Sequence, residues 1–254
     1  MVLMLPIAAD NGARLAAIMP TGLAALARGL GAPPSEVLAS ASGGDPAELA
    51  RIDLQDVSLL PAIRAFVVIV VDGLGHANLQ ARTAHARTLS ALPSRRIETV
   101  IPSTTGAALT SVTTGRLPRA HGLIGYRIRH PRLGVVSTLK DWAGITEPAE
   151  WQRAQPLFGL ATSIGARAVA IGRPAHATGG LTEAILTGAE YHGAVTIADR
   201  FAIASRLLRS GEPMLAYLYV DELDKAAHAE GWQSDLWLRR LEQLDGALQD
   251  LLRT

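Results

Sequence analysis

Cysteine is absent from this 254-residue chain, which excludes disulfides, thiol nucleophiles, zinc fingers and cysteine-bound iron–sulfur clusters. Any metal ion must therefore be bound by carboxylates, imidazoles, hydroxyls or backbone oxygens. The chain also lacks an excess of charge of either sign, because 24 Lys and Arg residues stand against 23 Asp and Glu residues. This balance indicates neither a nucleic-acid surface nor a membrane partner.

Long apolar runs are missing as well. No uninterrupted run approaches the ~20 residues that cross a bilayer. The N-terminal stretch Met1–Ile7 has no basic residue that would mark a signal peptide, and Asp10 follows it closely. We therefore expect a cytoplasmic protein. The sequence does contain 48% hydrophobic residues, enough to bury the core of one large domain or two small ones.

Strands and helices are predicted to alternate from residue 61 onward. Ala65–Val71 is continuously apolar and β-branched, as expected of a strand buried on both faces of a parallel sheet. Further strands are expected over Ile97–Ile101, Ala166–Ile171 and Met214–Val220, and helices over 76–90, 151–165, Ile197–Leu208 and from Ser234 to the end. Ser234 is the candidate N-cap of the last helix. This alternation predicts an α/β fold with a mainly parallel central sheet.

The first 60 residues carry no chemical motif. They are rich in Ala and Leu, with a helical stretch over Leu15–Leu30 that Pro20 is expected to break. We interpret residues 1–60 as an N-terminal cap of helices and loops, packed on a catalytic domain that spans residues 61–254.

Hydroxyl residues are concentrated in Ile101–Gly115, which reads IPSTTGAALTSVTTG. Pro102 and the following hydroxyls lead into a predicted helix that stops at Gly115, with a threonine hydroxyl at its N-terminus. The free N–H groups and positive dipole end at such a helix start favour a phosphate. A threonine hydroxyl is a poor nucleophile unless a base or a metal ion removes its proton. Roles as caps or helix-face residues remain open for the threonines of this stretch, which are Thr104, Thr105, Thr110, Thr113 and Thr114.

Two further acidic features follow predicted strands. Asp72 ends the first strand, at the edge where α/β sheets bind ligands, although Asp-Gly is also a common turn. A dinucleotide fingerprint at Gly73-Leu-Gly75 is weak, because the third glycine is replaced by Asn78. Asp224 and His228 lie four residues apart after another strand, so one helical turn can place both on one metal ion. The simpler interpretation of that pair is a solvated acidic turn, with Asp221 and Glu222 as further surface charge.

Several ordered motifs together resemble a known family. Val71-Asp72-Gly-Leu-Gly75, Pro102-Ser-Thr-Thr105 with Thr114-Gly115, Pro118-x-x-His-Gly122, and Tyr219-Val-Asp-Glu-Leu-Asp224-Lys-Ala-Ala-His228 look like the type I phosphodiesterase/nucleotide pyrophosphatase branch of the alkaline phosphatase superfamily. The resemblance runs from about Phe66 to the C-terminus. It implies an α/β/α sandwich with two divalent metal ions, usually zinc.

The resemblance also implies roles for individual residues. Asp72 and Thr105 would contact one metal ion, and Asp224 and His228 the other. Thr105 would attack phosphorus and form a phospho-threonine that water then hydrolyses. The implied substrate is a small-molecule phosphodiester or nucleotide. Two departures stand out: Ala108 occupies the place of a phosphate-binding asparagine, and no histidine follows His228.

These departures lead to an expectation about the length of the protein. The family carries an Asp-His-Gly segment and a later metal-binding histidine, so we expect the 254 residues to be the N-terminal part of a longer hydrolase. Alternatives are a phosphomonoesterase or phosphomutase of the same superfamily, or a non-catalytic fragment that keeps the fold without the complete two-metal site.

The excursion over 119–148, with Arg119, Tyr126, Arg127 and Arg129, is a candidate substrate-facing loop, although solvated loop residues explain it equally well.

Overall fold

We describe the fold from a computed structural model that places residues 12–43, 61–140, 142, 144–145 and 151–253. The chain divides into two compact units. The sheet unit comprises residues 64–96, 166–177 and 189–254, and the helical unit comprises residues 1–63, 97–165 and 178–188. Each unit is described by itself.

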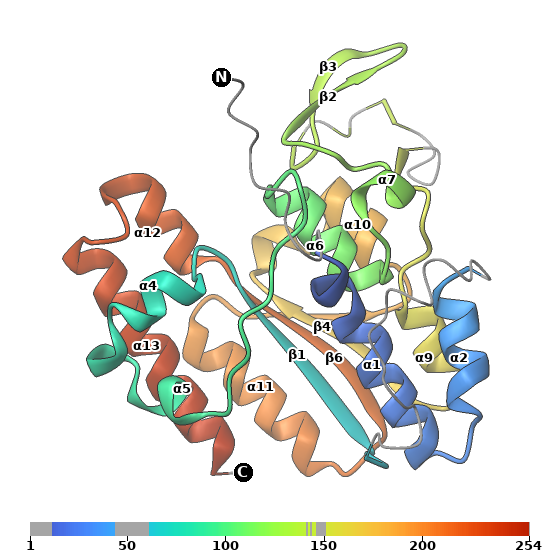
Figure 1. The fold of residues 1–254 in the computed structure, drawn as a ribbon, viewed down its shortest axis with the longest axis horizontal. Coiled ribbons are helices and arrows are strands. Elements are labelled where there is room, and N and C mark those ends of the chain that lie inside the picture. The colour runs from blue at the N-terminus through green and yellow to red at the C-terminus, as the bar shows by residue number, and fades with distance from the viewer. Residues whose placement is uncertain (1–11, 44–60, 141, 143, 146–150, 254) are drawn as a thin grey trace, which may run out of the picture. The chain divides into compact units, whose positions relative to one another are not determined.

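Four parallel strands form the centre of the sheet unit (Figure 1). Their order across the sheet is β1, β6, β4 and β5, and their bounds are β1 Ala65–Val71, β4 Arg167–Gly172, β5 Glu190–Gly193 and β6 Met214–Val220. β1 and β6 run in register, so that Val71 lies opposite Val220 and their C-terminal ends coincide. The residues that follow the two strands, Asp72 and Asp221, therefore emerge at one edge of the sheet.

Helices α11 (Ile197–Arg209) and α13 (Asp235–Leu252) pack against each other, and α11 also contacts β4 and β6. Phe201, Trp237 and Leu241 are buried in the core that these helices share with the sheet. Ser234 caps α13 by accepting the Trp237 N–H at 3.2 Å, as the sequence predicts. The remaining helical segments of this unit are α4 (His76–Gln80), η2 (Thr83–His85), α5 (Arg87–Ala91), η3 (Pro174–His176) and α12 (Glu222–Glu230).

Two predictions for the sheet unit need correction, and one strand was missed. β6 is deeply buried, whereas β1 is half-buried apart from Val68, because β1 lies at one end of the described sheet. The single helix expected over 76–90 is three short segments, because Asp245 of α13 accepts the backbone N–H groups of Thr88 and Leu89 and starts a new helix there. Strand β5, which includes polar residues, was not predicted at all.

The helical unit is assembled around α6 (Thr105–Thr114), which contacts α1 (Ala13–Gly29), α7 (Pro118–His121) and α10 (Gly180–Leu186). Helix α2 (Pro34–Ala41) packs on α1 and contacts α9 (Phe158–Ser163). Helix α1 continues through Pro20, contrary to the predicted break. Pro20 is buried and packs so closely on Gly115 that a side chain at 115 would overlap it, so tertiary packing offsets the helix-breaking cost of the proline.

Two other predictions fail in this unit because of tertiary contacts. Residues 97–101 join no described strand, and Val100 is instead buried among apolar residues of the helical unit. The helix expected over 151–165 is limited to α9, because the backbone N–H groups of Arg153 and Leu157 bond to His121 and Thr113 rather than within a helix. The excursion after α7 contains an antiparallel hairpin of β2 (Arg127–His130) and β3 (Gly134–Ser137).

The predicted class, α/β with a mainly parallel central sheet, is confirmed. The division into a cap over 1–60 and a catalytic domain over 61–254 stays a prediction, and residues 1–11 and 44–60 of the cap lie outside the described part. No helix in the described part of the chain combines the length and apolar character needed to cross a bilayer.

Candidate functional site

Helix α6 begins and ends where the sequence predicts. Thr104 is its N-cap residue, and its hydroxyl accepts the Ala107 N–H at 3.4 Å. Gly115 ends the helix in the left-handed conformation, with φ +69°, which a glycine adopts at little cost. The first residue of the helix proper is Thr105, which is half-buried. Its hydroxyl lies in the turn whose N–H groups are best placed to bind an anion.

The other threonines of α6 serve the helix itself. The Thr110, Thr113 and Thr114 hydroxyls donate to backbone carbonyls four residues earlier, at 2.6, 3.0 and 2.6 Å, and all three side chains are buried. Such back-bonding is the usual role of threonine on a helix face. Thr104 is used as a cap, so Thr105 is the threonine of the first helical turn that remains a candidate nucleophile.

Asp72 and Asp224 are neighbours at the edge of the sheet unit. The Asp224 N–H donates to the Asp72 carbonyl at 3.1 Å. Gly73 has φ +76°, and a side chain at 73 would overlap the Asp224 backbone, so this close approach requires glycine. The Asp72 carboxylate accepts the Gly73 N–H at 3.1 Å and the Tyr219 hydroxyl at 2.7 Å. The structure thus brings the first predicted metal ligand beside the second motif.

The Asp224–His228 pair has the predicted geometry on one turn of α12. His228 Nε2 lies 3.5 Å from Asp224 Oδ1. The His228 side chain is 82% exposed and the Asp224 side chain 32% exposed, so the pair faces solvent. Burial raises the pKa of Asp224, and the negative charge of Asp72 raises it further. The accumulated negative charge is what a divalent cation would neutralise.

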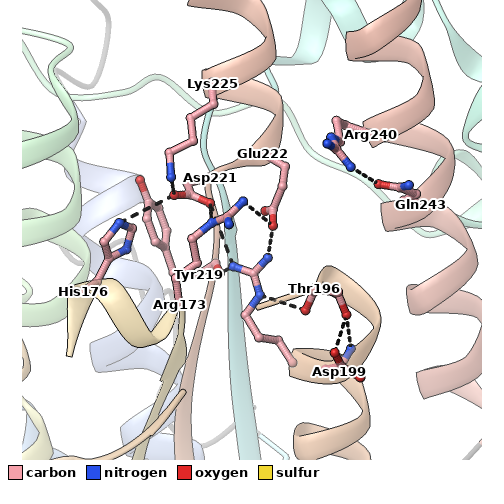
Figure 2. A network of polar contacts seen from close by, with 11 residues as sticks. Arg173, His176, Thr196, Asp199, Tyr219, Asp221, Glu222, Lys225, Arg240 and Gln243 are labelled. Carbon is pink, nitrogen blue, oxygen red and sulfur yellow. Dashed lines mark hydrogen bonds and ion pairs between the residues drawn. The ribbon is translucent and has the colours of Figure 1, made fainter. Parts of the chain in front are cut away.

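Asp221 and Glu222, which the sequence analysis left as surface charge, are buried at the start of α12. Figure 2 shows the cations that compensate them. Arg173 donates to Asp221 at 2.6 Å and to Glu222 at 2.9 Å. The fully buried Arg200 of α11 donates to Glu222 and, at 2.9 Å, to the Tyr219 carbonyl. Arg173 and Arg200 thereby stabilise the junction between β6 and α12 by pairing with its two buried carboxylates.

The periphery of this network is more exposed. Lys225 Nζ lies 2.5 Å from Asp221 Oδ2, and His176 Nε2 lies 3.7 Å from the same oxygen. Burial opposes ionisation of Asp221, yet hydrogen bonds from Lys225 and Arg173 lower the pKa of this carboxyl below its ordinary value. Burial lowers the pKa of His176. Asp221 is therefore a compensated structural anion, in contrast with Asp224.

The chemistry of the donor set fits divalent cations only in part. Asp72, Asp224 and His228 supply the carboxylate and imidazole ligands that zinc accepts, and the first two lie against each other. Within the described residues, however, no group of three or more His, Asp or Glu side chains is arranged so that it could hold a metal ion. The fourth predicted ligand, Thr105, belongs to the helical unit.

Sequence reasoning missed Tyr219 and Arg200. Arg200 had a detectable signal, because it lies on the apolar stripe of an amphipathic helix, one residue before the buried Phe201. A charged side chain on such a stripe must be paired. Tyr219 had a weaker one, since its contact with Asp72 depends on the strand register.

The sequence was compared with models of protein families. The model described as type I phosphodiesterase / nucleotide pyrophosphatase matches residues 66–254, which is most of the chain. The chain belongs to this family. The match begins at the second residue of β1 and includes Asp72, Thr105, Asp224 and His228. A comparison with curated proteins finds no significant match.

Solved structures share the fold at low sequence identity. Murine ectonucleotide pyrophosphatase / phosphodiesterase 5 aligns with a TM-score of 0.55 and 18% identity, over 74% of this chain and 51% of that one. The human protein of the same name aligns with a TM-score of 0.56 and 20% identity, over 74% of this chain and 51% of that one. An inactive murine variant, in which a threonine is replaced by alanine, is in complex with AMP. It aligns with a TM-score of 0.56 and 18% identity, over 75% of this chain and 52% of that one. The chain spans about half the length of these structures.

Proposed function

We propose that this chain carries the nucleophile and part of the metal site of a hydrolase that cleaves phosphodiester or pyrophosphate bonds. The observation that carries the proposal is the position of Thr105 at the first residue of α6, in a chain that belongs to a phosphodiesterase and nucleotide pyrophosphatase family. The AMP bound by the murine relative supports a nucleotide or a similar small-molecule phosphodiester as the substrate.

The reaction has two displacements at phosphorus. In the first, a bond forms between Thr105 Oγ1 and phosphorus, the bond to the leaving-group oxygen breaks, and the hydroxyl proton passes through solvent water to that oxygen. The N–H groups of the first turn of α6 bind the phosphate oxygens and favour their negative charge. In the second, water attacks phosphorus and breaks its bond to Oγ1, which restores Thr105 and releases the phosphate product.

Two divalent ions, which we propose to be zinc, complete this chemistry. Asp72 and Thr105 would hold one ion, and Asp224 and His228 the other. When bound, such ions lower the pKa of hydroxyl groups and neutralise charge on phosphate. The fit is supported by the carboxylate and imidazole donors of Asp72, Asp224 and His228, and by the effect of Asp72 on the pKa of Asp224.

A second candidate is a domain that keeps the fold but lacks turnover by itself. The observation that favours it is the missing three-ligand group in the described residues. We also propose that the whole protein has this hydrolase activity, that residues 61–254 form its catalytic domain, that it is cytoplasmic and that it has no nucleic-acid partner.

Thr105→Ala and Thr105→Ser test the nucleophile. With bis-p-nitrophenyl phosphate as substrate and zinc supplied, we expect Thr105→Ala to lose at least about 10³-fold in turnover, as removal of a nucleophile does. Thr105→Ser, which keeps a hydroxyl, should retain measurable turnover. Metal content should be about two ions per chain in the wild type and largely unchanged in both variants.

The same assay distinguishes the alternatives. Faster cleavage of mono- than of bis-p-nitrophenyl phosphate would indicate a phosphomonoesterase. Full activity of Thr105→Ala would eliminate Thr105 as the nucleophile. At most one bound ion and no turnover by the wild-type chain would favour the fold-retaining domain.

A further inference from the structure

The Tyr219 hydroxyl makes a direct hydrogen bond to the proposed metal ligand Asp72, donating to Asp72 Oδ2 at 2.7 Å. The other carboxylate oxygen, Oδ1, accepts the Gly73 N–H at 3.1 Å. Donors on both oxygens restrict rotation of the carboxylate about its χ2 bond. Of these two donors the phenol is the one that comes from β6, so Tyr219 ties the carboxylate of Asp72 to that strand.

The backbone of Tyr219 is itself held firmly. Parallel pairing places Tyr219 opposite Val70, two residues before Asp72, and the Asp72 N–H donates to the Val220 carbonyl at 2.9 Å. The Tyr219 carbonyl accepts from Arg200 at 2.9 Å. Arg200 is fully buried and paired with Glu222. The arginine network therefore fixes the element from which the phenol reaches Asp72.

The Tyr219 ring is also restrained on its faces. It stacks on Tyr217, with the ring centroids 6.3 Å apart and an interplanar angle of 14°. The His176 ring lies against it at 6.2 Å. Strand pairing and the two neighbouring rings support the ring orientation in which the hydroxyl meets Asp72.

We propose that Tyr219 is a positioning residue for Asp72: its hydroxyl fixes the orientation in which this carboxylate binds a divalent cation. The proposal rests on the proposed function, which makes Asp72 a metal ligand. Groups that hydrogen-bond a ligating carboxylate typically contribute 10–100-fold to metal affinity. Asp72 is also adjacent to Asp224, so an unrestrained carboxylate could turn away from its neighbouring negative charge and from the cation as well.

Tyr219→Phe removes the hydroxyl and keeps the ring, and Tyr191→Phe is its matched control. The Tyr191 hydroxyl also makes one hydrogen bond, to the Arg173 carbonyl at 2.8 Å, and the residue lies in the same sheet on β5. Both variants lose one phenolic hydrogen bond. They differ in whether the lost partner is the proposed metal ligand.

The measurement is zinc affinity of the full chain, determined by competition with a chromophoric chelator, alongside thermal unfolding in excess chelator. Asp72→Asn serves as the reference for loss of the ligand. We expect Tyr219→Phe to weaken zinc binding by about 10–100-fold and Tyr191→Phe to leave it within about twofold of the wild type. Metal-free unfolding temperatures of the two variants should fall by similar amounts.

Three outcomes overturn the inference, and they can be told apart. Wild-type zinc affinity in Tyr219→Phe, together with weakened binding in Asp72→Asn, contradicts the positioning role and leaves the proposed function standing. No zinc binding by the wild-type chain, or undiminished binding in Asp72→Asn, contradicts the metal site of the proposed function and the inference with it. Equal weakening of zinc binding in Tyr191→Phe and Tyr219→Phe would mean that Tyr219 supports folding in general and does not position Asp72.

Discussion

The N-terminus of α6 and the junction between β6 and α12 carry the proposed chemistry in opposite ways. Around Thr105 the helical unit offers neutral groups, namely hydroxyls and backbone N–H donors, and the hydroxyls of Thr110, Thr113 and Thr114 are bonded within the helix. The β6–α12 junction is dense in charge, with buried carboxylates compensated by the fully buried Arg200 and the half-buried Arg173. The neutral region is suited to receive an anion, and the charged region to hold cations at fixed positions.

The difference also shows what stabilises each region. Local hydrogen bonds define the start of α6, and their loss costs little individually. At the junction, each charge depends on a partner from another element, so the loss of one partner leaves an uncompensated buried charge. Three variants test this contrast, from the largest expected effect on stability to the smallest.

Arg200→Met should have the largest effect, because buried Glu222 loses its fully buried partner and keeps the half-buried Arg173. Breaking a buried ion pair on one side typically costs 3–5 kcal/mol, and we expect a loss of about that size in the free energy of unfolding measured by urea denaturation. Arg206→Ala, an exposed position on the same helix, should stay within about 0.5 kcal/mol of the wild type.

The double variant Arg200→Met/Glu222→Met sharpens this prediction. Replacing both charges with apolar groups removes the uncompensated carboxylate, so the double variant should be more stable than Arg200→Met alone. If Arg200→Met costs no more than Arg206→Ala, the junction does not depend on the buried pair and the contrast between the two regions fails.

The helical unit has its own buried titratable group, His121, and should respond to acid. Burial lowers the pKa of His121 to about 4. The Leu123 N–H donates to its Nδ1 at 3.2 Å, and Nε2 lies 3.0 Å from the Ser111 hydroxyl, an arrangement for neutral imidazole. The unfolded state, with a pKa near 6.5, binds the proton first as the pH falls.

The contribution of neutral His121 to the free energy of unfolding is therefore fully present above about pH 6.5, and it is lost as the pH falls toward about 4. The loss should be on the order of 3 kcal/mol. His121→Gln, which cannot become charged, should show a flatter pH dependence of the free energy of unfolding over this window. Parallel pH profiles for the wild type and His121→Gln would contradict a buried neutral His121.

Thr104→Ala should have the smallest effect of the three. Its hydroxyl caps α6, and loss of an N-cap typically costs about 1 kcal/mol. Its effect on turnover should be small beside that of Thr105→Ala, because the proposal assigns the nucleophile to Thr105. A loss of turnover in Thr104→Ala as large as that in Thr105→Ala would remove the distinction between the neighbouring hydroxyls.

The same contrast explains what the sequence could predict. Features set by local signals were predicted well: the bounds of β1 and β6, the end of α6 at Gly115, and the cap at Ser234. Features set by distant partners were missed. Asp245 restarts a helix at α5, Pro20 stays within α1 because it packs on Gly115, and residues 151–157 bond to other segments.

The candidate site divides along the same line. The Asp224–His228 pair follows from helical spacing and was predicted with its geometry. The burial of Asp221 and Glu222 follows from Arg173 and Arg200, which come from two other elements. Composition cannot reveal such pairing, because a balanced net charge is the same whether the charges are exposed or buried.

The most direct test of the central claim is the covalent intermediate. The zinc-loaded chain is mixed with bis-p-nitrophenyl phosphate, quenched in acid within the first turnover, digested, and examined by mass spectrometry. We predict a phosphorylated peptide with the ester on Thr105, absent from Thr105→Ala. Turnover by the wild-type chain without any phosphoester on Thr105, or with the phosphoester on another residue, would contradict the account.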